Sequence, residues 1–176
     1  MKEKEEFAHE LISFDPVVTK EQIETVADLA EIVWHEHYDF IIGKEQVDYM
    51  IDRFQSVSAM RTQMEQDSYE YYKIISLSGD AGYFAFRREE EVLFLSKIYI
   101  LKKFRGRNYA RKALDFMEGI CKESDLKKIW LTVNRNNGTS IKIYENLGFE
   151  KIRTQVADIG SGYVMDDFVM EKTIHS

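Results

Sequence analysis

The chain has little of several residue types, and each shortage argues against a class of protein. It contains one cysteine, Cys121, among 176 residues, so no disulfide can form within it. It contains one proline, Pro16, and no stretch rich in Gly, Ser or Pro that would indicate a linker. No apolar run approaches the ~20 residues of a membrane helix, and the charged start lacks the apolar core of a signal peptide. We therefore expect a cytoplasmic protein without a membrane partner, with one domain over residues 1–176 and a flexible extension at residues 1–8.

Basic side chains are also fewer than acidic ones. The chain carries 31 acidic and 24 basic side chains, which gives a formal net charge of −7. Proteins that bind nucleic acids usually present a basic surface, so we expect no nucleic-acid partner. An acidic surface suits a cationic or neutral small substrate. The hydrophobic content of 44% is ordinary for a globular protein.

Apolar periodicity predicts helices in the first third of the chain. Thr19 is a candidate N-cap, and Gln22, three residues later, would complete a capping box. The helix that follows is expected to end before a loop from His37 to Gly43. Two shorter helices are expected at residues 45–54 and 57–66.

Strand patterns dominate the rest of the chain. We expect strands at residues 10–18, Tyr69–Leu77, Ala81–Arg87, Val92–Leu101, Lys128–Val133, Phe149–Val156 and Tyr163–Lys172. The strand Val92–Leu101 is apolar on both faces, as central strands are. A helix joins it to Lys128–Val133, so these two strands should run parallel. The expected fold class is α/β, with a mixed sheet of about seven strands, antiparallel except for one central parallel pair, flanked by helices.

A basic segment follows the central strand where the next helix begins. Its members are Lys102, Lys103, Arg105, Arg107, Arg111 and Lys112, with no acid among them. Free N–H groups at a helix start attract anions, and successive N–H groups in a tight turn can hold a pyrophosphate. Gly106 and Asn108 both tolerate the positive φ that such a turn requires. The segment indicates a phosphate-binding turn, and the alternative is a solvated helix terminus.

Two motifs resemble those of the Gcn5-related N-acetyltransferases, the GNAT superfamily. The residues Arg105-Gly106-Arg107-Asn108-Tyr109-Ala110 are similar to Gln/Arg-x-x-Gly-x-Gly/Ala, with Asn108 replacing the middle glycine. The residues Asn137-x-x-Ser140-x-x-x-Tyr144-Glu145-Asn146-Leu147-Gly148-Phe149 resemble Asn-x-x-Ala-x-x-x-Tyr-x-x-x-Gly-Phe, with Ser140 replacing alanine. The order of the expected elements from residue 10 to 172 also fits this family.

The resemblance implies acetyl-CoA as cosubstrate. Pantetheine would lie between the two parallel strands and pair with the backbone of one of them, as a peptide adds to a sheet edge. The cofactor-binding residues implied are Ile98, Tyr99, Ile100, Arg105, Gly106, Arg107, Asn108, Tyr109, Ala110, Asn137 and Tyr144. Tyr144 is also the implied catalytic acid, which would protonate the departing thiolate. A phenol is a weaker acid than a thiol, so complete proton transfer needs help from the site.

The acceptor side is less defined. Several family members carry a Glu on the central strand as base, whereas this chain has Leu95-Ser96-Lys97 there. The candidates for substrate contact are Trp34, His35, His37 and Tyr38, because aromatic rings with nearby carboxylates can hold a cationic amine. Either histidine could act as base, and packing of these side chains into the core is the alternative. We expect no metal, since side chains two apart on a helix point to different sides.

The leading hypothesis is an N-acetyltransferase that acts in a ternary complex by direct attack of a primary amine on the thioester. The acceptor would be a small molecule, polyamine-like or otherwise cationic, or a peptide. The alternative is a non-catalytic sensor of acyl-CoA, which the missing carboxylate and Asn108 favour. Dimers are common in the family, so a homodimer is possible.

Overall fold

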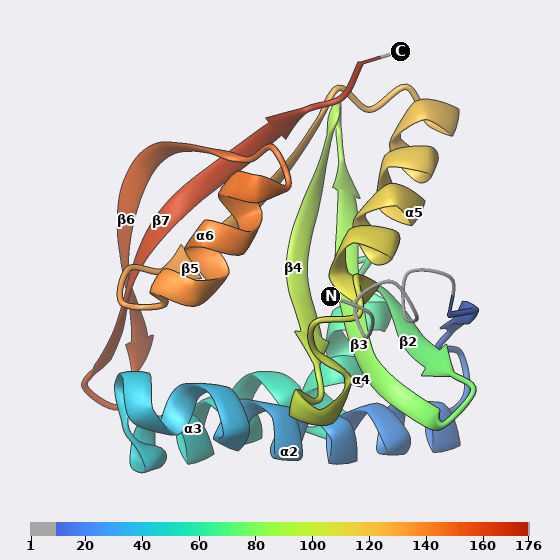
Figure 1. The fold of residues 1–176 in the computed structure, drawn as a ribbon. Coiled ribbons are helices and arrows are strands. Elements are labelled where there is room, and N and C mark those ends of the chain that lie inside the picture. The colour runs from blue at the N-terminus through green and yellow to red at the C-terminus, as the bar shows by residue number, and fades with distance from the viewer. Residues whose placement is uncertain (1–9, 176) are drawn as a thin grey trace. The chain divides into compact units, whose positions relative to one another are not determined.

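The computed structural model describes residues 10–175, which form an α/β fold around a seven-stranded mixed sheet (Figure 1). The strand order is β1-β2-β3-β4-β5-β7-β6. The pair β4 (Val92–Ile100) and β5 (Lys128–Asn134) is parallel, so the predicted fold class is confirmed. The expected extension at residues 1–8 lies outside the described residues, and a single domain over residues 1–176 stays a prediction. Among the described residues, no helix combines the length and apolar character needed to cross a membrane.

Contacts divide the chain into two compact units, which we describe one at a time. The first unit takes the described residues up to Arg87 together with Lys97–Phe116. The second takes Arg88–Ser96 together with the chain from Met117 onward. The strand β4 and the helix α5 (Tyr109–Glu123) each contribute residues to both.

The first unit begins with the long helix α2 (Lys20–Ile42). The predicted capping box is present, since the Gln22 N–H donates to Thr19 Oγ1 at 3.2 Å and the Thr19 N–H donates to Gln22 Oε1 at 2.9 Å. The loop predicted from His37 to Gly43 is wrong, because the helix continues to Ile42. It ends at Gly43, whose φ of +87° departs from the helix while its N–H still donates to Asp39 O.

Two further helical segments pack against α2. The predicted helix over residues 45–54 is instead α3 (Lys44–Met50), which runs directly into the π-helix η2 (Ile51–Gln55). The predicted helix at 57–66 is α4 (Val57–Gln66), capped by Ser56. A π-turn holds an extra residue and is frequently found at functional sites.

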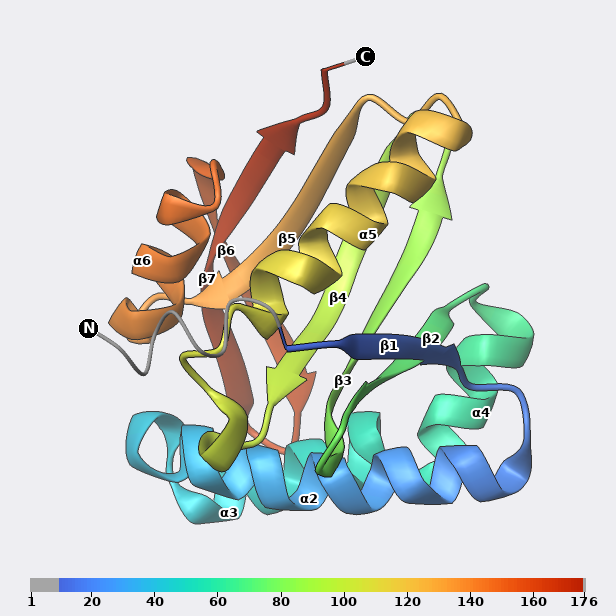
Figure 2. The same cartoon turned by 45° about the vertical axis from the view of Figure 1, so that its right-hand side comes forward.

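The sheet of the first unit has an aromatic layer on each face. It contains β1 (Ile12–Pro16), β2 (Glu70–Ser76) and β3 (Gly79–Glu89), with β1 alongside β2 in Figure 2. On one face, the rings of Phe14, Tyr72 and Phe84 pack around Phe116 of α5. On the other, Tyr71 and Tyr83 bond to Gln63 of α4 and Gln55 of η2. Successive residues of a strand point to opposite faces, which explains this alternation.

The second unit pairs β5 with the hairpin of β7 (Tyr163–Thr173) and β6 (Glu150–Gly160), beside helix α6 (Gly138–Asn146) (Figure 1). The strand β6 continues to Gly160, beyond the predicted end at Val156, because the turn at Ser161-Gly162 comes only there. Cys121 is fully buried, and burial raises its thiol pKa to about 11, so it has the packing role expected of a buried cysteine.

Candidate active site

The turn that follows β4 has the backbone geometry expected of an anion-binding turn. The residues Lys102–Phe104 form one turn of 3₁₀-helix, and the chain then passes through Gly106 at φ +79° and Asn108 at φ +62°. Both were predicted to tolerate positive φ, and the structure confirms that both adopt it. The helix α5 starts at Tyr109, and the Lys112 N–H donates to Asn108 O at 3.0 Å. The N–H groups of the first helical turn have no acceptor inside the helix and so suit an anion.

Carboxylates and backbone carbonyls engage three basic side chains of this segment, those of Arg105, Arg107 and Lys112. The Arg105 Nε–H donates to Ile100 O at 2.9 Å, and its guanidinium lies 3.9 Å from Glu36. Arg107 lies 3.4 Å from Glu10, and the Lys112 ammonium donates to Glu10 O at 2.6 Å. With the side chains of Arg105 and Arg107 so engaged, the backbone N–H groups are the better candidates for contact with a phosphate.

The end of β4 carries the three residues predicted to pair with pantetheine, and all three are half-buried. The Tyr99 ring lies 5.4 Å from Trp34 and 6.2 Å from Tyr38, between ring centroids. The neighbouring strand comes close here, since a Cβ on Gly82 would lie 2.1 Å from Tyr99 O. The structure therefore brings two predicted acceptor residues, Trp34 and Tyr38, to the strand predicted to bind the cofactor.

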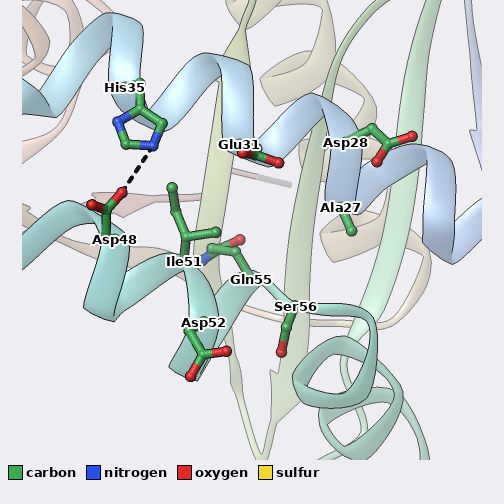
Figure 3. A pocket seen from close by; sticks show the side chains of 9 residues that line it. All are labelled: Ala27, Asp28, Glu31, His35, Asp48, Ile51, Asp52, Gln55 and Ser56. Carbon is green, nitrogen blue, oxygen red and sulfur yellow. Dashed lines mark ion pairs between the residues drawn. The ribbon is translucent and has the colours of Figure 1, made fainter. Parts of the chain in front are cut away.

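The two histidines of the predicted acceptor group lie in different surroundings. His37 packs edge-on against Tyr38, with ring centroids 4.7 Å apart. His35 lies between two carboxylates, with Nδ1 2.9 Å from Asp39 Oδ1 and Nε2 3.2 Å from Asp48 Oδ1. His35 thus belongs to a separate pocket (Figure 3).

This acidic pocket, of about 340 Å³, was missed from the sequence. Its lining residues are Ala27, Asp28, Glu31, His35, Asp48, Ile51, Asp52, Gln55 and Ser56. All but Ser56 come from one face of α2 and one face of α3 with η2, and Ser56 lies between η2 and α4 (Figure 3). Carboxylates repeat at helical spacing in both segments, which was the available signal.

Lys97 is the second feature that sequence reasoning missed. It occupies the stretch of β4 where the sequence offered no carboxylate, and its side chain is only 6% exposed. Its ammonium nitrogen contacts Gln63 Oε1, Tyr71 Oη and, at 3.5 Å, Phe54 O. Burial lowers the pKa of Lys97 to about 7 and raises that of Tyr71 above its ordinary value. A lysine with this pKa is partly neutral near pH 7.

The second unit contains Asn137 and Tyr144, the other two residues predicted to contact the cofactor. Asn137 is 2% exposed, and its side-chain oxygen caps α6 by accepting from the Ser140 N–H at 3.2 Å. Tyr144 is half-buried on α6, with its ring edge-on to Phe149 at 5.7 Å between centroids. Gly148 follows the helix at φ +92°, the left-handed conformation that glycine commonly adopts after a helix C-terminus.

The parallel ladder between β4 and β5 is short. It pairs Val92–Phe94 with Lys128–Trp130, and the rings of its last pair, Phe94 and Trp130, stack at 4.2 Å between centroids. The strand β5 continues to Asn134 in its antiparallel pairing with β7. Across residues 10–175, no group of three or more His, Cys, Asp or Glu side chains is arranged to hold a metal ion.

Solved structures of similar fold are numerous. The PaiA N-acetyltransferase from Thermoplasma acidophilum, in complex with coenzyme A, is 20% identical with a TM-score of 0.76, over 93% of this chain and 99% of that one. The ribosomal-protein-S18-alanine N-acetyltransferase from Escherichia coli is 12% identical with a TM-score of 0.69, over 94% and 96%. A spermidine N-acetyltransferase chimera of SpeG from Vibrio cholerae and hSSAT is 14% identical with a TM-score of 0.65, over 92% and 95%.

The sequence comparisons identify the family. No curated protein matches the chain. The model of the acetyltransferase (GNAT) family matches residues 29–149, which is well over half of the chain and includes the turn at 105–110 and both Asn137 and Tyr144. The chain therefore belongs to the acetyltransferase (GNAT) family.

Proposed function

We propose that the protein transfers the acetyl group of acetyl-CoA to a primary amine of a small cationic molecule or a peptide. The turn at residues 105–110 carries this proposal, because it combines two left-handed residues with the free N–H groups of a helix start. Family membership supports it independently. The pyrophosphate would lie on the backbone of Arg105–Ala110.

The rest of the cofactor would use β4. Pantetheine would pair with the backbone of Ile98, Tyr99 and Ile100, which are half-buried and so reachable. Within the second unit, the parallel ladder between β4 and β5 ends at Phe94 and Trp130. Asn137 would contact the cofactor near the pantetheine.

The proposed chemistry is a direct transfer. The neutral amine attacks the thioester carbonyl, the C–N bond forms, and the C–S bond breaks with the electron pair leaving on sulfur. Tyr144 would give its proton, or a strong hydrogen bond, to the departing thiolate. A backbone N–H of β4 near Ile98 would stabilise the oxyanion.

Aromatic side chains support a cationic acceptor. Tyr38 and Tyr99 are half-buried at the end of β4 and pack against the buried Trp34, and aromatic faces attract ammonium groups. His37, in contact with Tyr38, is the candidate for accepting the proton of the amine. Structural neighbours named for spermidine and for a ribosomal-protein alanine make both polyamines and peptide amines worth testing.

The test is thiol release from acetyl-CoA over a panel of polyamines, amino sugars, amino acids and N-terminal peptides. Turnover with one class would establish the reaction and the acceptor chemistry together. We expect Tyr144→Phe to bind coenzyme A normally and to lower turnover by roughly 10²-fold or more, the usual loss of an acid catalyst. Unchanged turnover in this variant would remove Tyr144 from the mechanism. Tight binding of acetyl-CoA with no turnover on any amine would favour the sensor alternative.

A further inference from the structure

Asp167 of β7 is a buried carboxylate without a hydrogen-bond donor. The residue is 7% exposed, and its Oδ1 accepts no hydrogen bond from any residue between 10 and 175. Within the same part of the chain, it forms no ion pair. An ionised carboxylate removed from water is costly unless a donor satisfies it. The unsatisfied oxygen therefore indicates that a donor group of a ligand completes this position in the working protein.

Strand pairing places Asp167 beside the turn that begins α6. The strand β7 lies between β5 and β6, and Asp167 pairs with Asn134, the last residue of β5 (Figure 1). The Asn134 backbone carbonyl accepts from the N–H of Asn137 and its side-chain oxygen from the N–H of Asn136, both at 2.9 Å. Asn137 in turn caps α6, the helix that carries Tyr144. Within the second unit, Asp167 is thus one strand pair away from the start of the helix of the proposed acid.

The charged groups around Asp167 are paired with one another and leave its carboxylate available. Its neighbour Asp166 lies 2.9 Å from Arg135, and on the same face of β7 Glu171 lies 2.6 Å from Lys128. The residues opposite it on β5 and β6 are neutral amides, Asn134 and Gln155. Burial, with the charge of Asp166, raises the pKa of Asp167 to about 6. A carboxylate with this pKa is ionised at pH 7 and is a stronger base than an ordinary aspartate.

We propose that Asp167 binds the ammonium group of the acceptor and takes its proton. The proton passes to Oδ1, and the electron pair of the broken N–H bond stays on nitrogen as the lone pair that attacks the thioester. Both partners become neutral in this step, so removal from water favours the transfer. The assignment rests on the acetyl transfer proposed above, and it gives Asp167 the role for which His37 is the candidate in the first unit.

Asp167→Asn tests this role, with Asp115→Asn, an exposed substitution on α5, as the control. We expect Asp167→Asn to fold and to bind coenzyme A as the native protein does, which thermal melting and calorimetric titration check. Its kcat/KM for the amine that the native protein accepts best should fall by roughly 10²-fold or more, the usual loss of a general base. Native kcat/KM in this variant would remove Asp167 from the reaction, and lost coenzyme A affinity would assign it to the cofactor instead.

The pH dependence of kcat/KM separates this role from a structural one. In the native protein kcat/KM should fall below about pH 6, as Asp167 becomes protonated. Asp166→Asn removes the neighbouring charge, so it should move this fall to lower pH and keep native kcat/KM above it. A fall that stays in place in Asp166→Asn refutes the proposal, and its disappearance in His37→Asn would then assign the proton to His37. Absence of turnover in the native protein on every amine would instead refute the acetyl transfer itself, and this assignment with it.

Discussion

At the scale of single residues, Lys97 is the most unusual side chain of the first unit. It lies on the buried face of β4 and has three oxygen acceptors, which suit an ammonium group, yet burial lowers its pKa to about 7. Between pH 7 and the ordinary lysine value of 10.5, the unfolded chain therefore binds a proton that the folded chain does not. Stability must then rise with pH across this window and be independent of this group below it.

Replacing Lys97 by Met should remove this pH dependence. We expect the free energy of unfolding of the native protein to rise by about 2 kcal/mol from pH 7 to pH 9 relative to Lys97→Met. Urea denaturation at the two pH values measures it. Lys142→Met, at an exposed position of α6, is the control and should retain the native dependence. If the free energy of unfolding changed with pH in the same way in the native protein and in Lys97→Met, Lys97 would have to stay charged when buried.

Gly82 is required for a different reason, the close approach of two backbones. An added Cβ would lie 2.1 Å from Tyr99 O, and a backbone oxygen cannot turn aside as a side chain can. We expect Gly82→Ala to lower the free energy of unfolding by about 2–3 kcal/mol, as overpacked sites do. Because Tyr99 lies in the strand proposed for pantetheine, coenzyme A binding should weaken as well.

A substitution at a second glycine provides the control for Gly82, and chemical denaturation measures the stability of both variants. Gly119 lies in α5, where an added Cβ meets nothing within 4 Å. Gly119→Ala should therefore be neutral or stabilising by up to about 1 kcal/mol, the usual gain inside a helix. Equal stabilities for the two variants would mean that β3 and β4 can separate without cost at Tyr99.

At the scale of elements, the turn between β4 and α5 depends on the left-handed residue Asn108. Glycine adopts φ +62° without strain, whereas alanine pays roughly 1–2 kcal/mol there. We expect Asn108→Gly to keep or improve coenzyme A affinity, and Asn108→Ala to weaken it about 5- to 10-fold. Isothermal titration with coenzyme A measures both. Full affinity in Asn108→Ala would show that the cofactor does not depend on the conformation of this turn.

Local chemistry explains which elements the sequence could predict. Thr19 with Gln22 was recognisable because a capping box needs only neighbouring residues, and Gly106 and Asn108 because few residues accept positive φ. The end of α2 was misjudged because tertiary contacts, such as those of Trp34 and Tyr38 with Tyr99, support helical residues of modest propensity.

Features that depend on distant segments were not predictable. The change from α3 to the π-helix η2 leaves no local signal in the sequence. It accompanies the burial of Gln55, which accepts a hydrogen bond from Tyr83, 28 residues away along the chain. The burial of Lys97 depends on acceptors from Phe54, Gln63 and Tyr71, which only the fold brings together. The acidic pocket likewise needs two helices to meet along matching faces.

At the scale of the whole molecule, two groups shape the dependence of stability on pH. Asp167 of β7 is 7% exposed, and its Oδ1 has no hydrogen-bond partner within residues 10–175. Burial, with the charge of Asp166, raises the pKa of Asp167 from 3.8 to about 6. Between these values the folded chain holds a proton that the unfolded chain has lost, so this group lowers stability as pH rises from about 4 to 6. Lys97 acts in the opposite sense above pH 7.

Because the contributions of separate titrating groups to the free energy of unfolding add, Asp167 and Lys97 together predict a shallow minimum in this free energy between about pH 6 and 7. The side chain of Asp167→Asn resembles the protonated acid, so the free energy of unfolding of this variant should equal that of the native protein near pH 4. At pH 7.5 it should be higher than the native value by about 1 kcal/mol, which allows for partial screening by solvent. The exposed control Asp115→Asn should follow the native curve. The double variant Asp167→Asn, Lys97→Met should show no minimum when urea denaturation is repeated from pH 4 to 9. A minimum that persists in the double variant would assign the pH dependence to other groups.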